Sequence, residues 1–338
     1  MSMSSLSKAA TLVATGALFV SLTACSQDTG AQGGATETVA ADQPLRLAMN
    51  VYSRTLPYFQ DMIRGVQDQA EEDGHTTVDV TYGETNPQQQ YDQLENALST
   101  SPNGMLIVPV DPGALLPVIQ QASTSGVPVV TLANDIDAAG HQSQLAHAGQ
   151  EYVEIGRRKA QYIVDALGGQ GTVGYVHGIR GLTFSELQSK GAMEVFEANP
   201  GITVVDGPYA GEFSSDAGLT ATENVLTANP NLDALYYDND DIALGGIMAV
   251  QQRGRAMDDI VIIGTDGGEP ALQAVESGTL DMTISLCGYA TGRAGASALI
   301  ANLRDGSKPE NRFIEVAGLE ITRDNLTDAR AKMASGDC

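Results

Sequence analysis

Residues 105–132 read MLIVPVDPGALLPVIQQASTSGVPVVTL, and this stretch decides the fold class. It begins with the apolar run 105–109, continues with a helix-forming segment at 114–125 that ends at Gly126, and closes with a second apolar run at 127–132. Strands that are apolar along their whole length are typical of a sheet covered on both faces. The stretch therefore predicts a parallel sheet with helices on both of its faces.

The same alternation extends in both directions from this stretch. Before it, we expect a strand, a helix, a strand and a helix at 45–49, 57–72, 78–82 and 87–100. After it, we expect helices at 151–167, 184–198, 215–228, 242–253 and 270–277, and strands at 172–176, 202–205, 232–237, 260–264 and 280–286. Two successive α/β units predict two lobes, since single cores seldom grow far past roughly 250–300 residues.

The chain is strongly acidic. It has 42 Asp and Glu against 18 Lys and Arg, which is a net charge of -24 at pH 7. Nucleic-acid binders neutralise phosphates with Lys and Arg, and polybasic membrane anchors need clusters of the same residues, so both classes are excluded. With 42% hydrophobic and 18% charged residues, the composition is that of a folded globular protein.

The sequence has none of the common catalytic or metal-binding motifs. Its four histidines, at positions 75, 141, 147 and 177, have no metal-ligand spacing, and neither a GxSxG nor a CxxC motif is present. No nucleotide-binding glycine motif opens either unit. We therefore predict a protein that is not an enzyme, with no metal and no cofactor. A lipid-tethered enzyme of unrecognised type is the alternative.

The amino-terminal residues indicate export. Residues 1–24 are predicted to be a signal peptide, because the apolar run 9–20 is too short and too rich in small residues to span a membrane. The sequence LTAC at 22–25 resembles the lipobox of bacterial lipoproteins, which implies lipidation at Cys25. Residues 25–43 are predicted to be a flexible tether. An ordinary secretory signal with an incidental cysteine is the alternative.

The two other cysteines, Cys287 and Cys338, leave two interpretations open. In an exported protein such a pair can form a disulfide. The two residues can equally be unrelated thiols, one of them buried and the other at a frayed terminus.

The expected strands are followed by loops that hold a notable share of the Asp, Asn and Arg residues. These loops are 50–57, 109–113, 133–137, 177–183, 238–241 and 265–269. In open parallel sheets, ligands bind beyond the carboxyl ends of the strands. We therefore predict that a polar ligand binds between two lobes that face each other across these loops.

Four stretches carry a resemblance to a known family. They are LPYF at 56–59, GVPVVTL at 126–132, YDNDDIALG at 237–245 and IGTDG at 263–267. With these stretches in this order, the chain from about 44 to 325 resembles the ribose-type family of periplasmic sugar-binding proteins, which feed ATP-driven importers.

The resemblance implies the periplasmic binding protein type I fold. This is an α/β architecture of two Rossmann-like lobes with parallel sheets, joined by a hinge that the chain crosses three times. The amino-terminal lobe would comprise 44–149 plus 287–315, and the carboxyl-terminal lobe 150–286 plus 316–338.

The resemblance also implies which residues bind the ligand. Tyr58, Phe59 and Phe213 correspond to aromatic residues that stack on the ligand, and Asn239 and Asp266 correspond to polar contacts. For Tyr58 and Phe59 the alternative is ordinary core packing at the start of a helix. For Asp266 the alternative is capping of the helix expected at 270–277.

Two neighbours of Asn239 have a different expected role. For Asp240 or Asp241, capping of the helix that begins there is the favoured interpretation.

Several positions depart from the family pattern. Leu56, Ala133, Asn134, Gln188 and Leu286 stand where the family has polar or charged residues. Asn134 and Gln188 remain predicted ligand contacts. We expect Arg54, Asp135 and Asp137 to supply substitutes for the missing groups. These changes predict a ligand other than ribose, such as a different sugar, a polyol, a cyclitol or a less hydroxylated molecule.

The function implied is that of an exported, monomeric binding protein. It would be lipid-anchored to the outer face of the bacterial cytoplasmic membrane, or periplasmic, and would touch the membrane only through the lipid. It would capture a sugar or polyol-like molecule between its lobes and deliver it to the permease subunits of an ABC importer. The alternatives are a non-sugar ligand, or a ligand sensor that signals to a membrane receptor.

Overall fold

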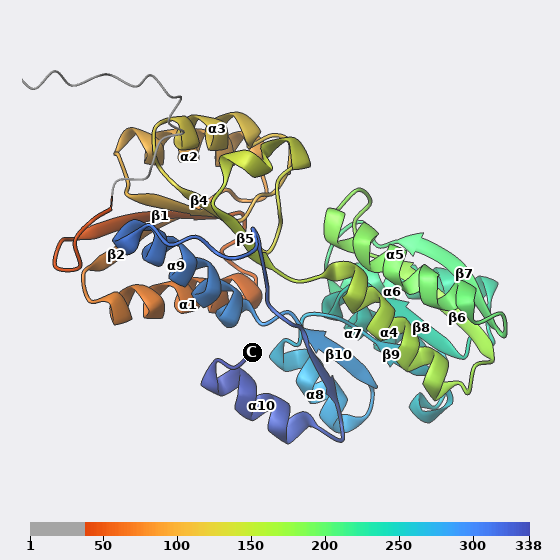
Figure 1. The fold of residues 1–338 in the computed structure, drawn as a ribbon. Coiled ribbons are helices and arrows are strands. Elements are labelled where there is room, and N and C mark those ends of the chain that lie inside the picture. The colour runs from red at the N-terminus through yellow and green to blue at the C-terminus, as the bar shows by residue number, and fades with distance from the viewer. Residues whose placement is uncertain (1–37) are drawn as a thin grey trace, which may run out of the picture. The chain divides into compact units, whose positions relative to one another are not determined.

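The computed structural model describes residues 38–338 (Figure 1). The predicted signal peptide and the predicted lipidation site Cys25 lie outside these residues. The described end of the predicted tether is bound to helix α9 (Gly288–Asp305), because the Val39 N–H donates to the Leu303 carbonyl at 2.8 Å and Arg304 donates to the Ala40 carbonyl at 2.6 Å. This end of the predicted tether therefore belongs to the folded part of the chain.

Strands and helices alternate along the described chain. The strands are β1 (Leu45–Val51), β2 (Thr76–Tyr82), β3 (Gly104–Ile107), β4 (Val129–Leu132), β5 (Ala146–Gly149), β6 (Gly171–His177), β7 (Ile202–Tyr209), β8 (Ala234–Tyr237), β9 (Val261–Ile263), β10 (Met282–Ser285), β11 (Phe313–Glu315) and β12 (Leu319–Thr322). The α-helices are α1 (Pro57–Asp73), α2 (Pro87–Ser99), α3 (Leu116–Thr124), α4 (Tyr152–Ala166), α5 (Thr183–Ala198), α6 (Ser215–Ala228), α7 (Asp240–Gln252), α8 (Glu269–Ser277), α9 and α10 (Leu326–Ser335). Two short 3-10 helices are η1 (Ala138–Ser143) and η2 (Met257–Asp259).

Within residues 38–338 the strands form two six-stranded sheets. The first has the order β11-β5-β4-β3-β1-β2, and the second has the order β12-β10-β9-β8-β6-β7. All neighbours in both sheets are parallel except β10 and β12, which are antiparallel. The predicted α/β class with two lobes is confirmed.

The chain passes between the two lobes three times, as predicted. It leaves the first sheet after β5 and enters α4, which packs on the second sheet. It returns between β10 and α9, and it crosses again between β11 and β12.

Each sheet is covered by helices on both faces. In the first lobe, α1 and α9 lie together on one side of the sheet and α2 and α3 on the other (Figure 1). In the second lobe, α4 packs against α5 and α6 packs against α7. Every residue of β3 and β4 is buried, as expected for strands that are apolar throughout.

Helix α9 is absent from the sequence prediction, and its glycines explain the omission. A Cβ on Gly292 would lie 2.0 Å from the Met62 carbonyl oxygen, and a Cβ on Gly65 of α1 would lie 2.1 Å from the Tyr289 carbonyl oxygen. Glycine at these places lets the two helices approach closely, although it lowers helix propensity by roughly 1 kcal/mol per residue. The other elements that the sequence did not predict are the short β5, β11 and β12, and α10.

Hydrogen bonds from one glutamine join two of the three crossings. Gln150, in the first crossing, is 4% exposed. Its Oε1 accepts from the Tyr58 hydroxyl at 3.2 Å, and its Nε2 donates to the Leu286 carbonyl and to the Thr291 hydroxyl at 2.9 Å. Because Leu286 lies in the second crossing, these bonds hold the two chain segments side by side.

A disulfide joins Cys287 to Cys338, with the Cα atoms 4.6 Å apart. Cys287 lies in the second crossing, and Cys338 is the last residue of the chain. Of the two interpretations that the sequence left open, the structure contains the bridge. It fastens the segment after α10 to the crossing.

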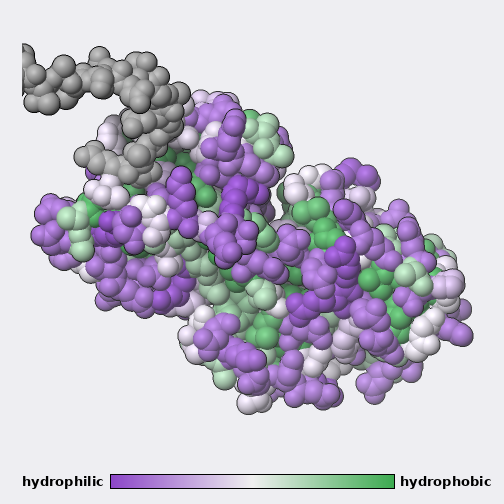
Figure 2. Space-filling view, viewed as in Figure 1, coloured by the Kyte–Doolittle hydropathy of each residue, from purple (hydrophilic) through white to green (hydrophobic). Residues whose placement is uncertain are grey.

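The exposed surface is largely polar. Figure 2 shows a face on which hydrophilic residues predominate and apolar residues are scattered. Among the described residues, the exposed large hydrophobic side chains are Tyr209 and Met248. In the same part of the chain, none of the helices has the length and apolar character needed to cross a membrane.

Candidate functional site

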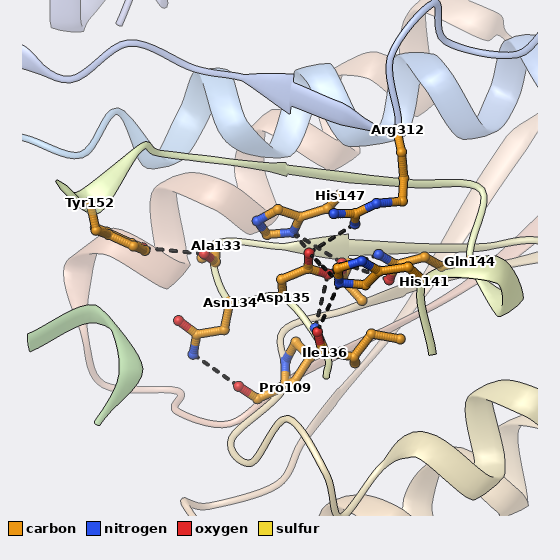
Figure 3. Close-up of polar contacts among 11 residues, drawn as sticks. Pro109, Ala133, Asn134, Asp135, Ile136, His141, Gln144, His147, Tyr152 and Arg312 are labelled. Carbon is orange, nitrogen blue, oxygen red and sulfur yellow. Dashed lines mark hydrogen bonds and ion pairs between the residues drawn. The ribbon is translucent and has the colours of Figure 1, made fainter. Parts of the chain in front are cut away.

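The loop after β4 contributes Asn134 and Asp135 to the carboxyl end of the first sheet (Figure 3). Ala133, directly after the strand, has a φ of 58°, a left-handed conformation that turns the chain sharply. Asn134 is half-buried, and its Nδ2 donates to the Pro109 carbonyl at 2.9 Å. The turn thus places the Asn134 side chain beside the end of β3.

The Asp135 carboxylate binds groups of the protein itself. Its Oδ2 accepts from Arg312 at 2.8 Å and lies 3.2 Å from His141 Nε2, while its Oδ1 accepts from Gln144 Nε2 at 2.8 Å (Figure 3). His147 lies behind this cluster, and burial lowers its pKa to about 4. Both carboxylate oxygens are therefore occupied here, and ligand contact at Asp135 stays a prediction.

The loop after β1 places aromatic side chains at the same end of the first sheet. Phe59 is 2% exposed and packs in the core, where its ring centroid lies 4.8 Å from that of Tyr52 and 5.3 Å from that of Tyr58. The alternative of core packing therefore describes Phe59. Arg54 is exposed and pairs with Glu84 at 2.6 Å, so its guanidinium is directed to this surface pair.

The charge of Asp266, in the second lobe, acts on three tyrosines, which are Tyr52 and Tyr58 of the first lobe and Tyr152 of the second. Burial raises the pKa of Tyr52 to about 12; a hydrogen bond with Asn134 opposes the rise, and the negative charge of Asp266 adds to it. Burial and the same carboxylate also raise the pKa of Tyr58 and of Tyr152. The Tyr152 hydroxyl also donates to the Ala133 carbonyl at 3.3 Å, so the start of α4 contacts the loop that carries Asn134. The sequence did not single out Tyr52 or Tyr152.

The segment after β8 contributes the polar residues of the second sheet. Asn239 is the N-cap of α7, because its Oδ1 accepts from the Ile242 N–H at 3.1 Å, and its Nδ2 donates to Asp266 Oδ2 at 3.3 Å. The expected cap at Asp240 or Asp241 is wrong. Asp240 instead accepts from the Thr283 hydroxyl at 2.8 Å and from the Gly267 N–H at 2.7 Å, and burial raises its pKa to about 6.

Asp266 follows β9 in a strained conformation. Its φ is 127°, and such positions cost of order 1–3 kcal/mol and cluster at binding sites. Burial raises the pKa of its carboxyl well above the ordinary value, and the negative charges of Asp240 and Asp241 act in the same direction. The alternative role as a helix cap is wrong, because Gly268 occupies the N-cap position of α8.

The two remaining predicted residues lie on α5 and before α6. Phe213 is half-buried, and its ring centroid lies 5.5 Å from that of Phe184. Gln188 is fully buried, and its Oε1 accepts from Lys159 Nζ at 3.1 Å and from the Thr265 hydroxyl at 3.0 Å. Gln188 thus contacts other residues of its own lobe.

Lys159 is a residue that the sequence analysis missed. It is fully buried, although Lys is among the residues least often found inside proteins. A signal was present, because Lys159 stands four residues from both Ile155 and Ile163 and therefore on the apolar face of α4.

A separate hollow of about 310 Å³ opens in the second lobe. Its lining includes His177, Ser185, Tyr209 and Asp238, and it contains none of the predicted ligand residues. Among the described residues, no group of three or more His, Cys, Asp or Glu is arranged to hold a metal ion. The candidate site is therefore the region around Tyr52, Asn134, Asn239 and Asp266.

Residues 47–308 match the model of the periplasmic binding protein domain family. The chain belongs to this family. The resemblance to ribose-type binding proteins is confirmed by relatives along most of the chain. The ribose import binding protein of Bacillus subtilis (strain 168) is 27% identical over 279 residues, which is 82% of this chain and 87% of that protein.

Two further relatives cover more of the chain. The xylitol-binding protein of Mycolicibacterium smegmatis is 26% identical over 327 residues, covering 95% of this chain and 87% of that protein. A solved structure of a periplasmic ribose ABC transporter from Conexibacter woesei is 36% identical, with a TM-score of 0.81, and the match covers 88% of this chain and 98% of that one. Two of these three relatives are thus named for ribose import or transport, and the third for xylitol binding.

Proposed function

We propose that this protein is an extracytoplasmic solute-binding lipoprotein that captures a sugar or polyol-like molecule between its lobes and delivers it to an ABC importer. The observation that carries the proposal is the contact between the lobes at this place, where the Tyr152 hydroxyl donates to the Ala133 carbonyl at 3.3 Å and the charge of Asp266 raises the pKa of Tyr52 and Tyr58. A molecule bound there would contact both lobes at once. The ribose and xylitol relatives support the ligand class.

The chemistry of these side chains suits a polyhydroxylated ligand. Asn134 and Asn239 offer amide donors and acceptors, Asp266 offers a carboxyl group, and aromatic rings can cover the apolar C–H face of a sugar. A neutral hydrogen bond contributes about 0.5–1.5 kcal/mol, and one to a charged group about 1.5–3 kcal/mol. A few such contacts suffice for micromolar binding, which corresponds to about -8 kcal/mol.

Ligand binding would act through the hinge. We place the lobes at 44–149 plus 287–315 and at 150–286 plus 316–338; the sheet membership of the strands is consistent with these bounds. A ligand that contacts both lobes favours the closed arrangement by its differential affinity for it. The closed form is the one that the permease would recognise, and we infer that the protein acts as a monomer and not as an enzyme.

The same proposal includes lipid anchoring. Signal cleavage before Cys25 and lipidation of that residue would hold the protein at the outer face of the cytoplasmic membrane. Metabolic labelling of cells with a radioactive fatty acid should mark the wild type and not a Cys25→Ser variant. Equal labelling of both would contradict this part of the proposal.

The ligand is tested by thermal unfolding of the protein from Ser26 onward, which retains every described residue. A panel of pentoses, hexoses, polyols and cyclitols is screened. A ligand at 100 times its Kd adds about 2.7 kcal/mol, which raises Tm by roughly 4 °C for a chain of this size. A shift from a sugar, polyol or cyclitol supports the proposal. If only non-carbohydrate molecules shift Tm, the proposed ligand class is wrong.

A further inference from the structure

Helix α4 holds an ammonium group in the interior of the second lobe. Lys159 has 0% exposed surface, and its Nζ donates to the Tyr237 carbonyl at 2.6 Å, to the Thr265 hydroxyl at 2.6 Å and to Gln188 Oε1 at 3.1 Å. These three acceptors match the three donors of an ammonium. An unpaired charge in the interior is very unfavourable, so these three hydrogen bonds are what allows the ammonium to be buried.

The three partners of Lys159 belong to segments that carry predicted ligand residues. Gln188 is itself such a residue. Tyr237 lies two residues before Asn239, and Thr265 directly precedes Asp266. One ammonium therefore joins α5, the end of β8 and the end of β9.

The same contacts determine how the Gln188 amide is oriented. The Thr265 hydroxyl accepts from Lys159 and donates to Gln188 Oε1 at 3.0 Å, so this oxygen receives two donors. A flipped amide would point its N–H groups at the ammonium, which has no acceptor. The Gln188 Nε2 is consequently directed toward the Asp238 carbonyl, 3.4 Å away.

We propose that Lys159 is a positioning residue of the ligand site. It holds the segments of Gln188, Asn239 and Asp266 in one arrangement and keeps the Gln188 amide in a single orientation, with its N–H donors toward the end of β8. The inference rests on the proposed function, since it concerns the same site. It names the role more closely, because the buried Gln188 amide contacts the Asp238 carbonyl and so supports the segment that carries Asn239.

The charge of Lys159 gives this arrangement a pH limit. The titratable groups around the ammonium are Tyr236, whose ring centroid lies 4.1 Å from Nζ, and the carboxylates of Asp238, Asp240 and Asp266, with Asp241 acting on Asp266. Burial lowers the pKa of Lys159 to about 8, although the three carboxylates act in the opposite direction. As the pH rises through this value, the group loses one donor and its charge. Ligand affinity should therefore fall above about pH 8.

The first arm of the test needs no ligand. The protein from Ser26 onward has four lysines, Lys159, Lys190, Lys308 and Lys332. With 13C at lysine Cε, one signal should titrate near pH 8, and Lys159→Met should remove it. A Lys159 signal without a transition near pH 8 would overturn the pH limit of the arrangement.

The same samples report on Gln188. Its side-chain amide resonances should shift in Lys159→Met and stay in place in Lys332→Met, which makes the same change on an exposed side chain of α10. If Lys159→Met does not fold, the wild type carries the test, because loss of the Lys159 charge near pH 8 should itself shift the Gln188 amide. An unchanged Gln188 amide overturns the proposal.

The second arm uses whichever sugar, polyol or cyclitol stabilises the wild type. Lys159→Met should lose about tenfold or more in affinity and should lose the decline above pH 8, since a charge-assisted contact is removed. Lys332→Met should keep both the affinity and the decline. Equal affinity in Lys159→Met and wild type overturns the proposal. If no such molecule binds the wild type, the proposed ligand class is wrong, and the ligand-free arm still decides the role of Lys159.

Discussion

The substitution Asp266→Asn should raise the stability of the free protein while weakening ligand binding. Asp266 is half-buried, and loss of solvent around its carboxyl raises its pKa, as do the negative charges of Asp240 and Asp241. The hydrogen bonds of the described residues give it one partner, Asn239 Nδ2 at 3.3 Å. An asparagine at this position keeps an oxygen for that bond, removes the charge, and is one of the residues that best tolerate a positive φ.

This environment gives the size of two effects of Asp266→Asn, one on stability and one on ligand affinity. Removal of the like-charge repulsion should stabilise the free protein by about 1 kcal/mol, the usual scale of a single substitution, and this corresponds to roughly 2 °C in Tm. Loss of a charged acceptor for a ligand hydroxyl removes about 1.5–3 kcal/mol, so affinity should fall about 10- to 150-fold. The two effects have opposite signs, which a general loss of structure cannot produce.

The pH dependence of Tm shows whether the ionised Asp266 carboxyl stabilises or destabilises the folded protein. A carboxyl whose pKa is raised by folding destabilises the protein above its ordinary pKa of 3.8, because the unfolded chain releases the proton more readily. The Tm difference between Asp266→Asn and wild type should grow as the pH rises above 3.8 and should vanish as the pH falls to about 3.8. Differential scanning calorimetry over this range, followed by titration calorimetry with the ligand, measures both effects.

The matched control is Asp240→Asn, because that carboxylate is buried but accepts from Thr283 and Gly267. Its substitution puts an amide N–H in place of an acceptor and should lower Tm. A lower Tm for Asp266→Asn, or an unchanged affinity, would refute the reasoning about this site.

Two further predictions concern the scaffold. Cys338→Ser opens a loop that spans 51 residues, so it should lower the free energy of unfolding by about 4 kcal/mol in urea denaturation; an unchanged midpoint would contradict it. Asp73→Asn removes a carboxylate whose pKa is lowered to about 2, mainly by a hydrogen bond from Arg304, and should destabilise the protein by about 2 kcal/mol at neutral pH. Because a lowered pKa stabilises only above the ordinary value of 3.8, this loss should shrink as the pH falls toward 2 in thermal melts; a loss of constant size would disprove the assignment.

The predicted strands and most helices were recovered because their signals are local. The run 105–109 and the run 127–132 are apolar throughout, and a buried strand needs nothing more to be recognised. The elements that were missed are short, as β11 is, or rich in glycine, as α9 is. In α9 the close approach to α1 outweighs the low helix propensity, and that approach involves residues more than 200 positions away in the sequence.

The candidate site was predictable in part. Asn134, Asn239 and Asp266 follow strands, and the carboxyl ends of parallel strands meet at one edge. The surroundings of Phe59 and Asp135 could not be predicted from the sequence, because they depend on residues that lie elsewhere in the chain. Phe59 packs in the core, and Asp135 is held by groups that lie up to 177 residues away.

The amino-acid sequence by itself determined the two α/β units, the polar strand ends and the family, because periodicity, glycine positions and short motifs are properties of neighbouring residues. Tertiary structure alone decided that Lys159 meets Gln188 and Thr265, that Tyr52 lies near Asp266, and that the last cysteine is bridged to the hinge. These pairings join segments far apart in the chain. Packing decides which groups become hydrogen-bond partners and which charges lie near each other inside a protein. A local sequence pattern does not predict this packing.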